Sequence, residues 1–181
     1  MTNYASNKYL QELKLLHGDM KRPRGFGGKF KRVKGFESFL KDKRPNTVLD
    51  YGCGKGVMMY NYREMFTDIE FDGYDIAIDE FSKINKESYE LVFSNDVLEH
   101  IEPEYLPNII KHIDSLAIKY IWLRIDTKPA KKKLSDGRNA HLILQGQKWW
   151  ESKLTQLIEA SITSSNLNDK GKLDIVLEKG I

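Results

Sequence analysis

The feature that most constrains the fold is a glycine-rich turn between an apolar, strand-like run and a helix-like run. It reads Val48-Leu-Asp-Tyr-Gly-Cys-Gly-Lys-Gly56, and the helical pattern starts at Val57. Three alternating glycines let the backbone turn tightly and let a ligand approach it closely. A strand, a glycine turn and a helix in this order are typical of the first unit of a nucleoside-binding α/β sheet.

The remaining chain alternates between the two periodicities. Apolar residues at three- and four-residue spacing predict helices at 4–17, 33–40, 57–66, 106–116 and 150–158. Short apolar runs predict strands at 47–51, 71–76, 89–94, 120–125, 161–166 and 173–177. This alternation predicts an α/β fold with three layers, a mostly parallel twisted sheet covered by helices on both faces, preceded by an N-terminal helical extension.

An acidic residue at the end of the second predicted strand accompanies the glycine turn. Asp75 lies 25 residues after Asp50, and a carboxylate there can accept both hydroxyls of a ribose. The dinucleotide pattern is G-x-G-x-x-G, with a pyrophosphate at the helix N-terminus. Here Gly52, Gly54 and Gly56 give G-x-G-x-G instead. The spacing therefore favours a nucleoside ligand without phosphates.

Three segments in order resemble the class I S-adenosylmethionine-dependent methyltransferases, across roughly residues 47–125. The glycine turn is similar to motif I of that family, and Tyr74-Asp75 falls where its ribose-binding acid lies. Tyr89-Glu-Leu-Val-Phe-Ser-Asn-Asp-Val-Leu-Glu-His-Ile101 resembles the family's fourth-strand segment. The segment Ser135–Leu142 of this chain also resembles small methyltransferase-like proteins of bacteria and phages. The resemblance implies a Rossmann-like fold and S-adenosylmethionine as the cofactor.

The resemblance also assigns cofactor-binding roles by position. It implies that the glycines line the methionine and ribose part, that Asp50 orients the loop, and that Asp75 holds the ribose hydroxyls. It places Ile76 beside the adenine and puts Asn95 and Asp96 at the amino or sulfonium end. The full implied set is Asp50, Gly52, Gly54, Gly56, Asp75, Ile76, Asn95 and Asp96.

One departure from the family concerns the adenine. Only about a dozen residues separate Ile76 from Tyr89, where fuller members have a helix, a strand and another helix. The segment that usually clamps the adenine is therefore reduced. We expect a more exposed adenine, or one covered by the N-terminal segment.

A polar loop after the fourth predicted strand contains the candidate catalytic residues. His141 is placed to take a proton during methyl transfer, and Arg138 to pair with an anionic group of the acceptor. A loop held together by its own hydrogen bonds is the alternative. Asp126 is a further candidate base. We interpret His100 as a packing or capping residue, with a catalytic base as its alternative. No ligand spacing predicts a metal.

The charge is unevenly distributed. The chain of 181 residues has a net charge of +3, but residues 1–46 hold 12 Lys and Arg against 4 Asp and Glu. We therefore predict a basic helical lid segment over 1–46 and a methyltransferase domain over 47–181. Phe26-Gly27-Gly28 among the basic residues favours a lid over the cofactor; stacking on nucleic-acid bases is the alternative.

The function predicted from these features is methyl transfer to a small-molecule or glycan-type acceptor. Two alternatives stay open: an RNA or DNA methyltransferase that uses the basic segment on phosphates, and a non-catalytic S-adenosylmethionine-binding protein. The single cysteine excludes an internal disulfide framework. No apolar run is long enough to cross a bilayer, and the N-terminus is polar. We expect a cytoplasmic protein with no membrane partner.

Overall fold

The computed structural model describes residues 4–18 and 29–180. The helices and strands occur in the predicted order, and their bounds differ from the predicted bounds mainly in the first and last residues. The helices are α1 (Asn7–His17), α2 (Phe36–Lys43), α3 (Val57–Met65), α4 (Leu106–Leu116) and α5 (Gln147–Leu157), with single turns of 3-10 helix at η1 (Asp79–Phe81) and η2 (Leu98–His100). The strands are β1 (Thr47–Tyr51), β2 (Glu70–Tyr74), β3 (Tyr89–Asn95), β4 (Ala117–Asp126), β5 (Ser161–Leu167) and β6 (Lys172–Glu178).

The six strands form one sheet in the order β2-β1-β3-β4-β6-β5. The pairs among β1, β2, β3 and β4 are parallel, and β6 is antiparallel to both β4 and β5. Only β6 therefore runs against the rest, which confirms the mostly parallel sheet. The strand order reverses at β1, whose neighbours are β2 on one side and β3 on the other. Open α/β sheets bind ligands beyond the strand ends at such a point.

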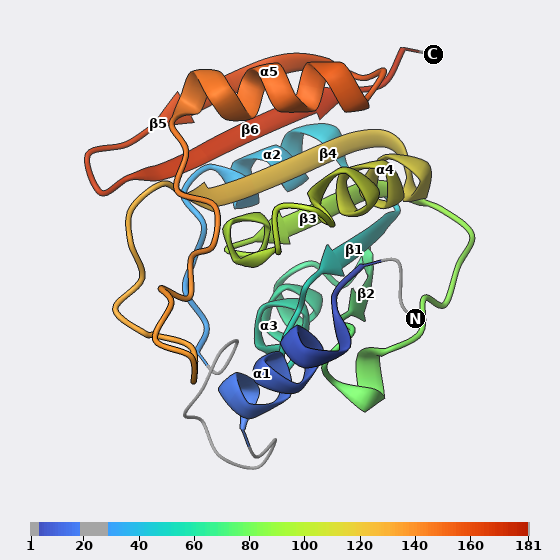
Figure 1. The fold of residues 1–181 in the computed structure, drawn as a ribbon. Coiled ribbons are helices and arrows are strands. Elements are labelled where there is room, and N and C mark those ends of the chain that lie inside the picture. Colours follow the sequence, from blue (N-terminus) through green and yellow to red (C-terminus); the bar gives the residue numbers. More distant parts are fainter. Residues whose placement is uncertain (1–3, 19–28, 181) are drawn as a thin grey trace.

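Alternating strand residues pack against helices on the two faces of the sheet (Figure 1). Leu49 and Val92 belong to a core shared with α4 and α5, whereas Val48 and Leu91 belong to a core shared with α2 and α3. The period of two in a strand sends neighbours to opposite faces, so the apolar runs of the central strands are buried on both sides. The three layers predicted from the sequence are therefore present.

The first helix lies apart from these layers. In α1, Tyr9 packs with Leu134 and Ala140 of the long connection between β4 and α5. Ser6 begins the helix by accepting the backbone N–H of Tyr9 at 3.1 Å, and it also donates to Glu102 at 2.8 Å from both its hydroxyl and its backbone N–H. These contacts hold α1 at the end of the sheet where β3 and β4 terminate.

Helix α2, unlike α1, packs on the sheet itself. Phe36 is fully buried, and its ring stacks on Phe93 of β3 with centroids 4.0 Å apart. The two helices of the basic segment 1–46 thus have different neighbours, and the boundary at residue 46 stays a prediction. Among the described residues, no helix is long and apolar enough to span a membrane.

Candidate functional site

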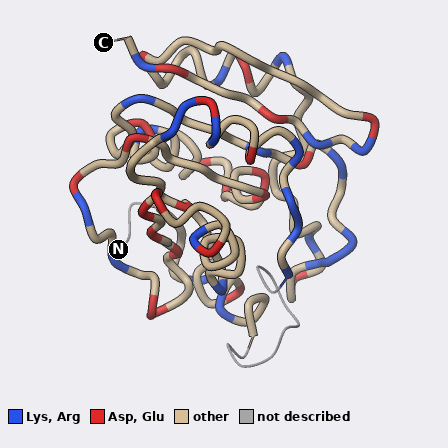
Figure 2. The backbone as a smooth tube through the Cα atoms, turned by 180° about the vertical axis from the view of Figure 1, so that it is seen from behind, with Lys and Arg blue, Asp and Glu red and all other residues tan. Residues whose placement is uncertain are grey.

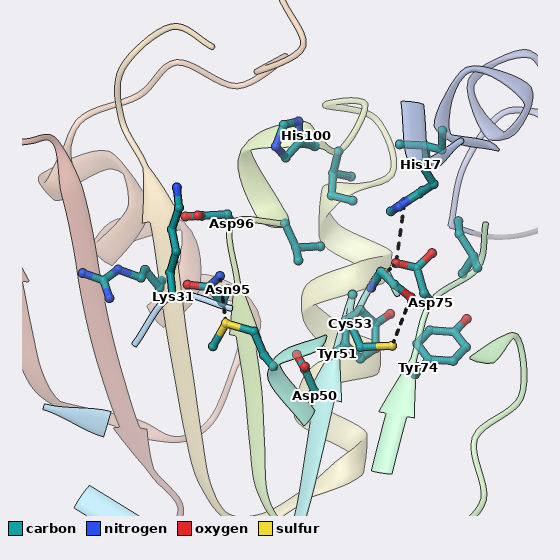
Figure 3. Close-up of a pocket in the computed structure, with 18 of the residues that line it drawn as sticks. His17, Lys31, Asp50, Tyr51, Cys53, Tyr74, Asp75, Asn95, Asp96 and His100 are labelled. Carbon is teal, nitrogen blue, oxygen red and sulfur yellow. Dashed lines mark hydrogen bonds and ion pairs between the residues drawn. The ribbon is translucent and has the colours of Figure 1, made fainter. Parts of the chain in front are cut away.

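A cavity of about 820 Å³ opens at the carboxyl ends of β1, β2 and β3 (Figure 3). The glycine turn forms its floor, and α1 and the connection after β4 contribute to its walls. Most of the predicted site residues line it: Asp50, Gly52, Gly54, Asp75, Ile76, Asn95, Asp96 and His141. Three do not: Gly56, Asp126 and Arg138. The structure thus brings together all the predicted cofactor residues except Gly56, and one of the predicted catalytic residues, His141.

The glycine turn needs glycine for two separate reasons. Gly52, Gly54 and Gly56 all have positive φ, at 81°, 55° and 69°, a region that other residues seldom adopt. A Cβ on Gly52 would also lie 2.3 Å from a methyl group of Val97. The backbone N–H of Gly52 donates to the carbonyl of Tyr74 at 2.7 Å. This bond fixes the turn to the end of β2.

The third glycine has a structural position behind the cavity. Gly56 is the N-cap of α3, and a Cβ there would lie 2.8 Å from the ring of Phe81 in η1. Only η1 lies between β2 and β3, and β2 is an edge strand. The predicted reduction of the adenine-clamping segment is therefore present in the structure, and what remains of it packs against the glycine turn.

Asp75 is held in place by the turn it accompanies. Its two carboxylate oxygens accept the backbone N–H groups of Gly54 and Ala77, each at 2.9 Å. A carboxylate oxygen has more than one acceptor site, so both oxygens can still accept a hydroxyl. His17 of α1 lies 3.8 Å from the same carboxylate (Figure 3). The donors that fix Asp75, together with the open cavity beside it, fit a ribose and its attached chain.

Asp50 is buried beneath the turn. The backbone N–H of Met59 bonds to it, whereas its Oδ2 has no hydrogen-bond partner among the described residues. Burial, with the nearby charge of Asp75, raises the pKa of Asp50 to about 7. The bond from Met59 joins the end of β1 to the first turn of α3, and the role of orienting the glycine loop stays a prediction.

The two polar residues at the end of β3, Asn95 and Asp96, lie in different surroundings. The amide of Asn95 lies 4.0 Å from the sulfur of Met58, facing the glycine turn. Asp96 has a positive φ of 57° and bonds to Lys172 at 2.8 Å. Lys172, which lines the cavity, also lies 2.8 Å from Asp126, which does not. One cation therefore joins the ends of β3, β4 and β6.

Two histidines meet on the far side of Asp96. The rings of His100 and His141 are nearly perpendicular, with centroids 4.7 Å apart. The Nδ1 of His100 bonds to the carbonyl of Ala140 at 2.7 Å, and that of His141 to the carbonyl of Lys128 at 2.5 Å. A carbonyl accepts only, so each Nδ1 carries the proton. Burial beside His141 lowers the pKa of His100 to about 4.

The buried carboxyl of Glu99 lies next to these rings. Its Oε1 accepts the backbone N–H of Asp126 at 2.8 Å, and its Oε2 has no partner among the described residues. Burial, with the nearby charge of Asp96, raises the pKa of Glu99 to about 8. One ligand atom from each of Glu99, His100 and His141 lies within 4.8 Å of the others.

Arg138 is directed toward its own loop. Its guanidinium bonds to Asp136 at 2.8 Å, and its backbone N–H bonds to the same side chain at 3.1 Å. Asn139 joins the ends of this loop by bonds to both the N–H and the carbonyl of Ala130. These bonds match the alternative of a self-supporting loop, and the role predicted for Arg138 stays a prediction.

Arg138 does not line the cavity, but other lysine and arginine side chains do. Lys29, Lys31, Arg32 and Lys132 line the cavity, and Figure 2 shows Lys and Arg gathered on these two neighbouring segments. Tyr9, Leu13 and His17 of α1 line it as well. The lid predicted for Phe26–Gly28 falls outside the described residues, but the residues on both sides of that stretch reach the cavity.

Sequence patterns did not reveal four of the site's residues. Glu99 and Val97 lie inside the recognised fourth-strand segment, but nothing local marks one as buried against histidines and the other as filling the space above Gly52. Lys172 comes from a late strand and His17 from the first helix. Of these residues only His17 had a signal, and it was weak: the amphipathic pattern of α1, which ends at His17, indicates a helix that packs on the rest of the chain.

Comparison with known proteins places this geometry in context. A family model described as a methyltransferase domain matches residues 29–163. None of the curated proteins matches the chain. The matched range contains the glycine turn, Asp75 and the histidine cluster, and it starts before α2.

Several solved structures share the fold. The DhpI–SAH complex is 16% identical with a TM-score of 0.65, over 97% of this chain and 99% of that chain. Magnesium protoporphyrin IX methyltransferase from Synechocystis PCC 6803, with bound SAH, is 17% identical with a TM-score of 0.57, over 95% and 93%. The Burkholderia thailandensis 1,6-didemethyltoxoflavin-N1-methyltransferase, with bound 1,6-didemethyltoxoflavin and S-adenosylhomocysteine, is 13% identical with a TM-score of 0.58, over 82% and 78%.

Proposed function

The chain belongs to the class I S-adenosylmethionine-dependent methyltransferase family, and from that premise we propose that it methylates a small acceptor with an anionic group. S-adenosylmethionine, the cofactor of this family, supplies a methyl group on a positively charged sulfur. The observation that supports the proposal is a single cavity with two chemically different ends. One end has the glycine turn with Asp75, and the other has lysine and arginine side chains with two imidazoles.

At the first end, the chain holds a nucleoside by fixed acceptors and by empty space. Asp75 is oriented by two backbone N–H groups before any ligand arrives, so little ordering is needed on binding. The cavity provides the room, and Gly52 and Val97, which pack against each other, both line it. Asn95 then lies between this end and Asp96, where we place the amino acid part of the cofactor.

At the second end, cations favour an anionic acceptor. Lys29, Lys31 and Arg32 come from the segment before α2, and Lys132 from the connection after β4. A carboxylate or phosphate on the acceptor would bind charged donors in a partly enclosed cavity, where such bonds are about twice as strong as neutral ones. The neighbours that name toxoflavin and porphyrin substrates are consistent with a small acceptor.

The chemistry is attack of an acceptor atom on the methyl carbon. The new bond forms as the carbon–sulfur bond breaks, and the electron pair stays on sulfur, which becomes neutral. A hydroxyl or amine acceptor must also lose a proton. The cavity aligns the acceptor with the methyl group and excludes water, and alignment supplies most of the acceleration in such a transfer. His100 and His141 are the imidazoles at the end where that proton leaves.

Two measurements test the proposal. Calorimetric titration with S-adenosylhomocysteine should show one site per chain. Mixtures of small hydroxyl and amine compounds, each offered with and without a carboxylate or phosphate, should then be screened for release of S-adenosylhomocysteine from S-adenosylmethionine. Turnover confined to anionic acceptors is the expected result. Binding with no turnover on any acceptor would favour a non-catalytic binding protein, and turnover on neutral acceptors alone would remove the role of the cations.

A further inference from the structure

The cluster of Glu99, His100 and His141 has a feature that methyl transfer itself does not require. Glu99 is fully buried, and its Oε2 has no hydrogen-bond partner among the described residues. An unsatisfied buried carboxyl oxygen is costly, because folding removes it from water with nothing in exchange. The same carboxyl group has a ligand atom within 4.8 Å of ring nitrogens of both histidines.

We propose that Glu99, His100 and His141 bind a divalent transition-metal ion at the acceptor end of the cavity. Two imidazoles and one carboxylate suit ions such as Zn²⁺, Co²⁺, Fe²⁺ and Mn²⁺. Such ions bind these atoms at about 2.0–2.2 Å. Atoms within 4.8 Å of one another therefore need only small side-chain rotations to converge on one ion.

The hydrogen bonds around the two rings match those of metal-binding histidines. Metal ligands of this type usually donate the other ring N–H to a backbone carbonyl or a carboxylate, which fixes the tautomer. Both rings do so here, His100 to Ala140 and His141 to Lys128. In each neutral ring the lone pair is then on Nε2, the nitrogen that a metal ion would take.

The local charge also favours a cation. Lys172 is an ammonium whose charge acts on Glu99, and it is shared between Asp96 and Asp126 at 2.8 Å each. Asp96, Asp126 and Lys172 together leave one net negative charge at the ends of β3 and β4, while the cations Lys29, Lys31 and Arg32 reach the cavity from the segment before α2. A divalent ion would balance that excess and satisfy Oε2.

The place of the site in the cavity suggests what a bound ion would do. His100 and His141 line the same cavity as Gly52 and Asp75, and three protein ligands leave coordination positions open. An acceptor oxygen on the ion would lose its proton more readily and would be held near the methyl group. This role rests on the proposed function, whereas ion binding does not. With an ion bound, His141 would be a metal ligand and would not accept the proton.

The test uses Co²⁺ alone, added to the metal-free full chain and followed by the visible absorption of the ion. We expect one bound Co²⁺ per chain. His141→Ala should weaken binding at least about 100-fold, since even the loss of a partner behind a ligand costs 10- to 100-fold. His112→Gln is the matched control, because His112 lies outside the cluster, bonded to Tyr51. It should bind Co²⁺ like the wild-type chain.

A replacement ligand separates a direct contact from a structural effect. His141→Cys should restore Co²⁺ binding and add a thiolate-to-cobalt charge-transfer band, which the wild-type chain should lack because Cys53 belongs to the glycine turn and not to the cluster. Absence of Co²⁺ binding by the wild-type chain, or equal binding by His141→Ala, would overturn the proposal. Thermal melting of each metal-free variant checks folding. Affinity for S-adenosylhomocysteine without metal should be the same in all, so failure of the cofactor site would be seen separately.

Discussion

The two ends of the cavity are built in different ways. At the cofactor end, Gly52, Gly54 and Asp75 come from two adjacent parallel strands, and backbone N–H groups hold the acid. At the acceptor end, the turn after β3 meets the long connection after β4 and helix α1, through bonds such as those from His100 to Ala140 and from Ser6 to Glu102. The first end depends on local backbone geometry and the second on contacts distant in sequence.

This difference indicates where each substrate's specificity resides. A backbone turn that only glycine can form tolerates little change, which suits a cofactor common to a family. Side chains presented by loops can change without loss of the fold, which suits an acceptor particular to one protein. Substitutions at the cofactor end should therefore affect binding and folding more than those at the acceptor end.

The largest effect is expected for Asp75→Ala. Two charge-assisted hydrogen bonds to the ribose contribute about 1.5–3 kcal/mol each, so affinity for S-adenosylhomocysteine should fall at least about 100-fold by calorimetry. Asp79→Ala is the control, because Asp79 is a nearby acid whose side chain is 94% exposed. Unchanged affinity in Asp75→Ala would show that the ribose binds elsewhere.

Alanine substitutions at Gly52 and Gly137 separate the free-energy cost of a steric clash from the cost of backbone strain. Gly52 and Gly137 have φ of 81° and 87°, but only Gly52 has a neighbour at 2.3 Å, while Gly137 has nothing within 4 Å. Each alanine should incur about 1–2 kcal/mol of strain. Gly52→Ala should lose a further 1–3 kcal/mol or so by overpacking against Val97. Urea unfolding measures both, and equal losses would contradict the tight turn.

The buried acid of the turn predicts a pH dependence of stability. Because the pKa of Asp50 is raised to about 7 in the folded chain, the folded state holds its proton more tightly than the unfolded state. That stabilisation is complete below about pH 4 and is lost as the pH rises through 7. The wild-type chain should therefore lose unfolding free energy relative to Asp50→Asn between pH 4 and 8. A difference that stays constant over that range would contradict the burial of this acid.

The smallest effect is expected for the binding of RNA or DNA. We assign the described cations before α2, which line the cavity and are exposed to solvent, to a small anionic acceptor, so we expect no RNA or DNA binding by fluorescence anisotropy even at low salt. Affinity that is measurable at low salt and falls steeply as salt rises would instead identify phosphate contacts. That result would revive the nucleic-acid methyltransferase as the function.

Sequence patterns predicted the cofactor end far better than the acceptor end. The strand, glycine turn and acid are consecutive features whose spacing has a direct geometric meaning, and β1 and α4 were placed at their observed bounds. The burial of Glu99 against His141 depends on how the 41 residues between them return to the turn after β3. Arg138 shows the same limit, because its bond to Asp136 is decided by the conformation of the loop.

A crystal structure of the chain with S-adenosylhomocysteine tests the central claim most directly. We expect the ribose hydroxyls on Asp75, the amino acid part over Gly52 and Gly54, and the sulfur directed toward Asn95 and the cations beyond it. The ligand bound outside this cavity, or bound with its ribose away from Asp75, would contradict the account.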